Sequence, residues 1–104
     1  MERILWKAHI YPGKEEEYVS RHDHIWPEMV ESLKAQGISN YSIFKCGRDI
    51  IGYYECEDPE QMKRIKAEDP AAKKWAESMK SIMAVETEED GVTPKVFKQV
   101  FYLD

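Results

Sequence analysis

The chain has 104 residues, the length of one domain, and we expect residues 1–104 to fold as a single unit. Its formal charge is −5, with 15 basic and 20 acidic residues, which argues against nucleic-acid binding because that needs a concentrated basic surface. No apolar run approaches the roughly 20 residues of a membrane span, so we expect no membrane partner.

The first residues and the cysteines bear on the cellular compartment. Residues 1–7 alternate and carry charge, so they lack the apolar core of a secretory signal peptide. The two cysteines, Cys46 and Cys56, are too few for a disulfide framework. A tight hairpin between them would place Cys46 opposite Asp49 rather than Cys56. We therefore expect a cytoplasmic protein whose thiols are reduced.

The predicted elements begin with a strand over residues 3–11, where apolar and polar side chains alternate. Residues 14–36 then repeat apolar side chains at three- and four-residue spacing, which predicts a helix. Pro27 cannot donate a backbone hydrogen bond, so we expect this helix to kink or restart near Ile25-Trp26.

A hairpin and two helix starts follow. Residues 39–46 and 50–57 are rich in β-branched and aromatic side chains and flank a four-residue turn, which predicts two paired strands. Asp58-Pro59 and Asp69-Pro70 each place a capping carboxylate before a proline, the combination typical of a helix start. We expect the second of these helices to run through about Met83.

The C-terminal part is predicted as an acidic surface loop over residues 84–95 and a closing strand over residues 96–103. The resulting order β-α-β-β-α-β is the ferredoxin-like α+β arrangement, an antiparallel sheet with helices on one face. Because nothing in the chain covers the other face, we expect two copies to pack there as a homodimer, a dimeric α+β barrel.

The stretch from His22 to Glu28 carries the most chemistry. Tyr18 precedes His22 by one helical turn, so the phenol and the imidazole share a helix face. Histidine titrates near neutral pH, which suits proton transfer on a polar, ring-shaped substrate. The alternative is a histidine that lies on a solvated helix without a function, and the pattern alone leaves both open.

Other kinds of site find less support. His22 and His24 are two residues apart and do not face one direction on a helix, and no matching Cys/His cluster lies elsewhere, so we expect no metal site. Neither cysteine sits at a helix start that would activate a thiolate. Trp26, Trp75 and Tyr41 are either core residues or apolar walls for a sugar ring.

These residues resemble the L-rhamnose mutarotase family over essentially the full length. The resemblance rests on four stretches: Tyr18-x-x-x-His22-x-x-x-Trp26-Pro27-Glu28, Gly37-Ile38-Ser39-Asn40-Tyr41-Ser42-Ile43, Trp75 followed by Met79, and Val100-Phe101-Tyr102-Leu103.

The resemblance implies a ferredoxin-like dimer that interconverts the α and β anomers of L-rhamnose, an isomerase that uses no cofactor. It implies His22 as the proton donor, Tyr18 and Tyr41 as residues that contact the substrate, and Trp75 as a ring against the sugar. Many family members carry a second tryptophan after the first, whereas this chain has Ala76, so we expect a roomier or differently shaped pocket.

The catalytic base stays open between a tyrosine, a carboxylate such as Glu28, and an ordered water. We expect Glu28 to cap the restarted helix and Trp26 to serve mainly in packing. Two other functions fit the same architecture: a cofactor-free or haem-degrading monooxygenase, and a non-catalytic module that binds a small ligand.

Overall fold

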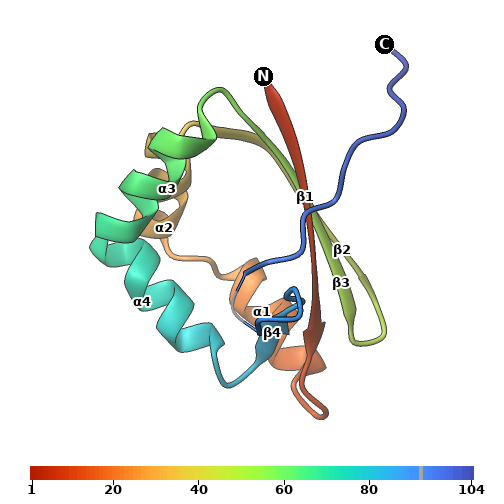
Figure 1. Cartoon of the computed structure of the whole chain (residues 1–104). Coiled ribbons are helices and arrows are strands. Elements are labelled where there is room, and N and C mark those ends of the chain that lie inside the picture. Colours follow the sequence, from red (N-terminus) through yellow and green to blue (C-terminus); the bar gives the residue numbers. More distant parts are fainter. Residues whose placement is uncertain (92) are drawn as a thin grey trace.

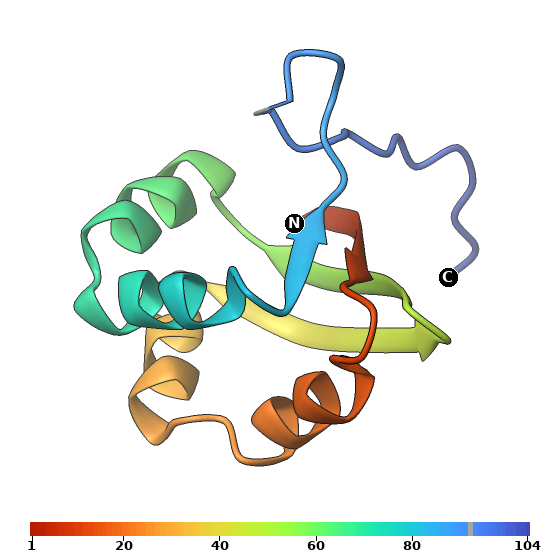
Figure 2. The same cartoon turned by 90° about the horizontal axis from the view of Figure 1, so that it is seen from below.

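The computed structural model describes residues 1–91 and 93–104. Four strands form one antiparallel sheet in the order β2-β3-β1-β4. The helices cover one face of this sheet, and the C-terminal segment lies on the other side (Figure 1, Figure 2). In chain order the elements are β1 Glu2–Ile10, α1 Glu15–Asp23, α2 Pro27–Ala35, β2 Ile38–Cys46, β3 Asp49–Cys56, α3 Pro59–Glu68, α4 Pro70–Met79 and β4 Met83–Val85.

The restart predicted near Ile25-Trp26 is confirmed, because the region is split into α1 and α2. Trp26 is the N-cap of α2, with an extended backbone at φ −63° and ψ 137°. Pro27 follows at the first helical position, where a backbone N–H would have no helical partner anyway. The break changes the direction of the chain just after His22.

The local signals in the middle of the chain are confirmed as well. In the hairpin Cys46 pairs with Asp49, and both cysteines are free thiols. Asp58 accepts a hydrogen bond from the Gln61 N–H at 3.2 Å and so caps α3. Asp69 accepts one from the Ala71 N–H at 2.8 Å and so caps α4.

The predicted closing strand is wrong. The fourth strand is Met83–Val85, and residues 96–103 form no strand. The helix α4 ends at Met79, earlier than predicted, and the chain turns at Ile82, which is fully buried and donates its N–H to the Met79 carbonyl at 3.0 Å. The Ile82 carbonyl accepts a hydrogen bond from the Tyr11 N–H at 2.8 Å, so the chain joins the edge of β1 at once.

The core lies between the sheet and the helices, and it positions the floor of the site. Its strand residues Ala8, Ile10 and Ile50 are fully buried. Beside them the indole of Trp6 lies over Gly52 of β3, where an added Cβ would overlap the ring. A glycine inside a strand therefore makes room for an aromatic floor.

Candidate active site

A cavity of about 440 Å³ opens between the helices and the inner face of β2. All four residues that the sequence predicted for the site line this cavity, although they come from three different elements. These residues are Tyr18 and His22 on α1, Tyr41 on β2 and Trp75 on α4. The lining consists of Tyr18, Val19, His22, Asp23 and Ile25 from α1 and the loop after it, Met29 and Leu33 from α2, Tyr41, Ile43 and Lys45 from β2, and Trp75 from α4.

His22 is held between two aromatic rings. Its ring centroid lies 4.4 Å from that of Tyr18, and the edge-on ring of Trp75 lies 5.4 Å away. Its Nδ1 is 2.9 Å from the Tyr18 carbonyl oxygen. Because a carbonyl only accepts, Nδ1 carries a proton and donates it, and Nε2 is the nitrogen left for a ligand.

Tyr18 carries a hydroxyl without a partner. The residue is 3 % exposed, and among the described residues nothing hydrogen-bonds its buried hydroxyl oxygen. Burial raises the pKa of the Tyr18 phenol to about 12, so the group is neutral near pH 7. Leaving a buried polar group unpaired costs roughly 1–3 kcal/mol, a cost that a ligand hydroxyl in the cavity would remove.

Tyr41 is oriented by Trp6. The indole Nε1–H donates to the Tyr41 hydroxyl oxygen at 3.1 Å, which leaves the Tyr41 O–H free to donate. Burial raises the pKa of Tyr41, so it too is a neutral donor. Reasoning from the sequence missed this role of Trp6, and the signal that would have found it is Gly52, opposite Trp6 in the register.

Trp75 forms a wall of the cavity, and Trp26 packs behind it. Trp75 lines the cavity, whereas Trp26 does not. The Trp26 ring packs perpendicular to the Trp75 ring at a centroid distance of 5.2 Å. Trp26 thus supports the indole that borders the cavity. Ala76, the next residue on α4, is exposed and lies outside the lining.

Two other residues of the stretch lie outside this cavity, although His24 lines the hollow next to it. His24 is exposed, and its Nδ1 lies 2.9 Å from the Ser20 carbonyl. Glu28 lies in the first turn of α2, where the helix dipole favours a negative charge. The capping hydrogen bond expected of Glu28 is not found among the described residues.

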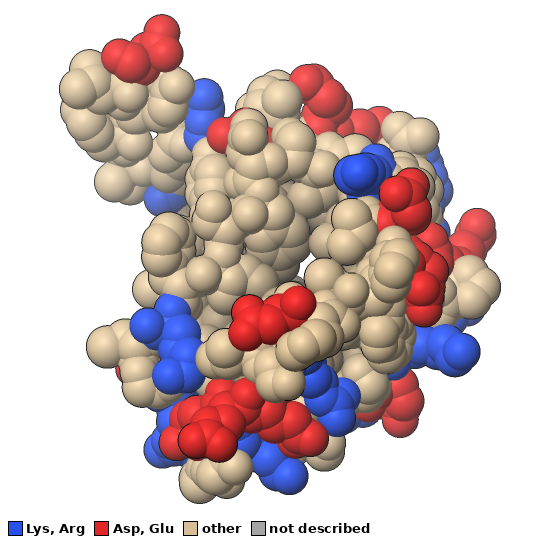
Figure 3. Space-filling model, turned by 180° about the vertical axis from the view of Figure 1, so that it is seen from behind, with Lys and Arg blue, Asp and Glu red and all other residues tan. Residues whose placement is uncertain are grey.

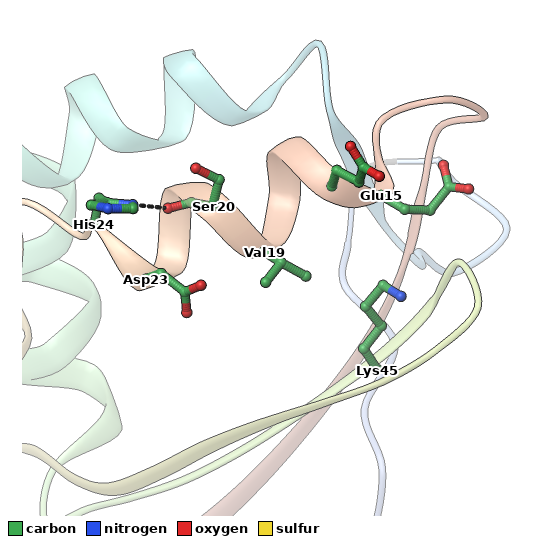
Figure 4. A pocket seen from close by; sticks show the side chains of 7 residues that line it. Glu15, Val19, Ser20, Asp23, His24 and Lys45 are labelled. Carbon is green, nitrogen blue, oxygen red and sulfur yellow. Dashed lines mark hydrogen bonds between the residues drawn. The ribbon is translucent and has the colours of Figure 1, made fainter.

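The cavity continues toward solvent in a hollow of about 370 Å³ between α1 and β2 (Figure 4). Val19, Asp23 and Lys45 line both spaces. In Figure 4 Asp23 points from α1 toward β2, and Lys45 points from β2 toward α1. The boundary between the two spaces therefore carries the acid Asp23 and the amine Lys45, and Glu15 and Glu16 also line the outer hollow. The interior is mainly aromatic and aliphatic.

The described residues offer no metal site and no membrane-spanning helix. Within residues 1–91 and 93–104, no three His, Cys, Asp or Glu side chains gather closely enough to hold a metal ion. Over the same ranges, no helix is long and apolar enough to cross a membrane.

The fold and the cavity together define a class of protein. It is a small α+β protein in which an antiparallel sheet and its helices enclose an aromatic cavity, with an imidazole beside two neutral phenols. Such a cavity suits proton transfer on a small polar ring.

Comparisons with known proteins make this class specific. The sequence model of the L-rhamnose mutarotase family matches residues 3–103. The chain is 42 % identical to an L-rhamnose mutarotase of Listeria monocytogenes over 99 % of both chains, and 41 % identical to one of Bacillus subtilis over 91 % of both. A crystal structure of L-rhamnose mutarotase from Formosa agariphila matches over 100 % of both chains, with a TM-score of 0.77 and 29 % identity. The chain belongs to the L-rhamnose mutarotase family.

Proposed function

We propose that this chain is an isomerase that interconverts the α and β anomers of L-rhamnose by acid–base opening and closure of the sugar ring. The observation that carries the proposal is the His22 imidazole, held in the cavity with Nδ1 bound to a carbonyl and Nε2 free. Family membership points to the same reaction.

In the proposed mechanism, protonated His22 donates its Nε2 proton to the ring oxygen while the anomeric hydroxyl loses its own. The bond between the anomeric carbon and the ring oxygen breaks, the carbonyl carbon rotates, and the ring closes on its other face. After donation the imidazole is neutral with its proton on Nδ1, the form that the Tyr18 carbonyl already holds. The ring therefore needs no reorientation, and Nε2 takes the proton back on closure. Such catalysis is worth about 10²–10⁴-fold.

The base that takes the anomeric proton lies among few groups. The raised pKa values of Tyr18 and Tyr41 keep both phenols protonated near neutral pH, so neither is available as a base and both can donate to sugar hydroxyls. Glu28 is outside the cavity, and Asp23 is the carboxylate in its lining. We assign the proton to Asp23 or to water at the mouth, and Asp23→Asn separates the two.

The shape of the cavity agrees with a 6-deoxy sugar. Trp75 offers a flat apolar wall to one face of the pyranose. Ile25, Met29 and Leu33 form an aliphatic side for the methyl group of L-rhamnose, while the phenols and the imidazole meet its hydroxyls.

Saturation-transfer NMR between the anomeric protons of L-rhamnose tests this function. His22→Ala should lower exchange by about 10²–10⁴-fold while the fold is kept. The matched control is His24→Ala, which removes a histidine with the same backbone contact from the outer hollow rather than from the cavity, and it should leave exchange unchanged. Near-normal exchange in His22→Ala would refute the assignment, and no acceleration by the wild-type protein would leave a non-catalytic binding module. L-Fucose, L-mannose and D-glucose then define the specificity.

We also propose that the protein is a cytoplasmic homodimer that pairs through the outer face of the sheet. The exposed Phe44 and Ile51 on that face support the dimer, and the two free thiols support a reducing compartment. Sedimentation velocity across a concentration series measures the mass, and a monomer throughout would rule out the dimer.

A further inference from the structure

The helix α1 carries two of the four site residues, Tyr18 and His22, but little of the helix is buried. Apart from Tyr18, its described residues are exposed or half-buried. The chain also turns on both sides of the helix, at Gly13 with φ 83° and at the extended Trp26. The position of the His22 imidazole in the cavity therefore depends on the contacts that hold α1 against its neighbours.

Arg21, the neighbour of His22 in the chain, ties α1 to α4. Its Nη1 donates a hydrogen bond to the Ser78 carbonyl oxygen at 2.8 Å. Among the hydrogen bonds and ion pairs of the described residues, this is the one that joins a side chain of α1 to another element. A short bond with a charged donor is stronger than a bond between neutral groups, so it is suited to fix the helix.

The carbonyl that receives this bond lies in the last turn of α4, where carbonyl groups lack helical partners. Among its described residues that turn holds no basic side chain, so Arg21 supplies a cation that a helix C-terminus favours. The Ser78 hydroxyl in turn donates to the Trp75 carbonyl oxygen at 2.8 Å. Arg21 thus binds the turn of α4 that follows Trp75, the residue whose indole lies 5.4 Å from the His22 ring.

The second contact of Arg21 stays within α1. Its Nη2 lies 3.4 Å from the Glu17 carboxylate, which also lies 3.8 Å from the Lys14 amine. The lower part of the molecule, at the height of α1 in Figure 1, carries both acidic and basic side chains on its surface (Figure 3). Exposed ion pairs of this kind contribute little to stability. The bond to α4 is therefore the contact that matters, and Glu17 orients the guanidinium for it.

We propose that Arg21 is a positioning residue of the isomerase, which sets the spacing of α1 and α4 and so holds His22 where its Nε2 reaches the sugar ring oxygen. Arg21 does not line the cavity, so it acts through His22. The inference rests on the proposed function and adds the part that aligns its acid. A displacement of about 1 Å in such a group costs about 10²-fold in rate. Binding depends less on Arg21, because Tyr41 and Trp75 lie on other elements.

Kinetics of variants at Arg21 test the proposal. Arg21→Met keeps the aliphatic stem and removes the donors, so it should lower kcat for anomer exchange by about 10- to 100-fold and change KM for L-rhamnose by less than about twofold. Arg21→Lys should recover part of kcat, because its ammonium still donates to the carbonyl. The matched control is Lys14→Met, which removes the other cation beside Glu17 and has no contact with α4. It should leave both constants unchanged.

The kinetic result is read only on folded protein, as shown by circular dichroism at the assay temperature. A normal kcat in Arg21→Met, or an equal loss in Lys14→Met, would overturn the proposal. Should Arg21→Met fail to fold, Arg21→Lys takes its place, and its kcat should lie below that of the wild type while its KM does not move.

NMR cross-peaks between the His22 imidazole and the Trp75 indole test the geometry without the reaction. The two rings meet edge to face, so the nuclear Overhauser cross-peaks should be present in the wild type and in Lys14→Met and should weaken in Arg21→Met. A loss of stability alone would not move them. Unchanged cross-peaks in Arg21→Met would overturn the role of Arg21 even if kcat fell. If the wild-type protein does not accelerate anomer exchange, the proposed function fails, and the cross-peaks alone decide on Arg21.

Discussion

The two faces of this sheet differ in what they leave unsatisfied. On the inner face the apolar side chains are packed, and the group without a partner is a polar one, the buried hydroxyl of Tyr18. On the outer face the polar side chains pair with one another, as Tyr53 does with Glu55, and the uncovered groups are apolar, such as Phe44. A buried hydroxyl without a hydrogen-bond partner favours a small polar ligand in the cavity, whereas an exposed apolar pair favours contact with another protein surface.

Adjacent substitutions on β3 give the largest expected contrast between the faces. Gly52→Ala places a methyl group against the Trp6 indole, so it should destabilise the protein by about 1–3 kcal/mol. It should also displace the Trp6 donor from Tyr41 and reduce anomer exchange by about 10²-fold. Ile51→Val on the outer face should cost about 0.5 kcal/mol and spare exchange. Urea unfolding and saturation-transfer NMR measure both, and equal effects would remove the distinction.

Alkaline pH should lower the stability of the protein through the inner face, because Tyr18 is buried there. Burial raises the pKa of Tyr18 from 10.0 to about 12. The unfolded chain therefore loses this proton near pH 10 while the folded chain keeps it, so stability is complete below pH 10 and falls between pH 10 and 12. At about 1.4 kcal/mol per pH unit, Tyr18 alone accounts for about 2–3 kcal/mol. Urea unfolding at pH 9 and 11.5 measures the loss. Tyr18→Phe should reduce it, whereas Tyr11→Phe, on an exposed tyrosine, should not.

Removal of a single tyrosine hydroxyl from each face should change the KM for L-rhamnose on the inner face alone. Tyr18→Phe deletes an unpaired hydroxyl, so the stability of the free protein should stay the same or rise slightly. The KM for L-rhamnose should rise by about tenfold, the worth of one hydrogen bond to the sugar. Tyr53→Phe removes the hydroxyl that donates to Glu55 at 2.7 Å on the outer face, and it should leave KM unchanged. A KM that moves equally in both variants would contradict a sugar contact by Tyr18.

The parts of the fold that the sequence predicted depend on local signals. Pro27 marks the restart of the helix, and Asp58 and Asp69 mark helix starts, each within one turn of chain. Helical spacing alone set Tyr18 and His22 side by side. The pattern left Tyr41 and Trp75 open between the core and a sugar wall, the resemblance assigned them to the site, and the fold brings them to the same cavity.

What local patterns missed depends on contacts between distant parts of the chain. The place of Trp6 over Gly52 follows from the register of β1 and β3, which no single stretch determines. Residues 96–103 have the apolar pattern of a strand, but they pair with no strand among the described residues. The prediction failed there because β1 already pairs with β3 on one edge and with Met83–Val85 on the other.

The contact between Arg3 and Tyr102 on the outer side of the sheet gives the smallest expected effect. The Arg3 guanidinium lies over the Tyr102 ring, 3.8 Å from its centroid. Cation–π pairs at exposed sites are worth about 0.5–1 kcal/mol, so Arg3→Ala should lower the free energy of unfolding by no more than that and should leave anomer exchange unchanged. Urea unfolding and saturation-transfer NMR measure the two quantities, and Arg64→Ala on α3 is the control. A loss of exchange in Arg3→Ala would contradict the separation of the outer side from the cavity.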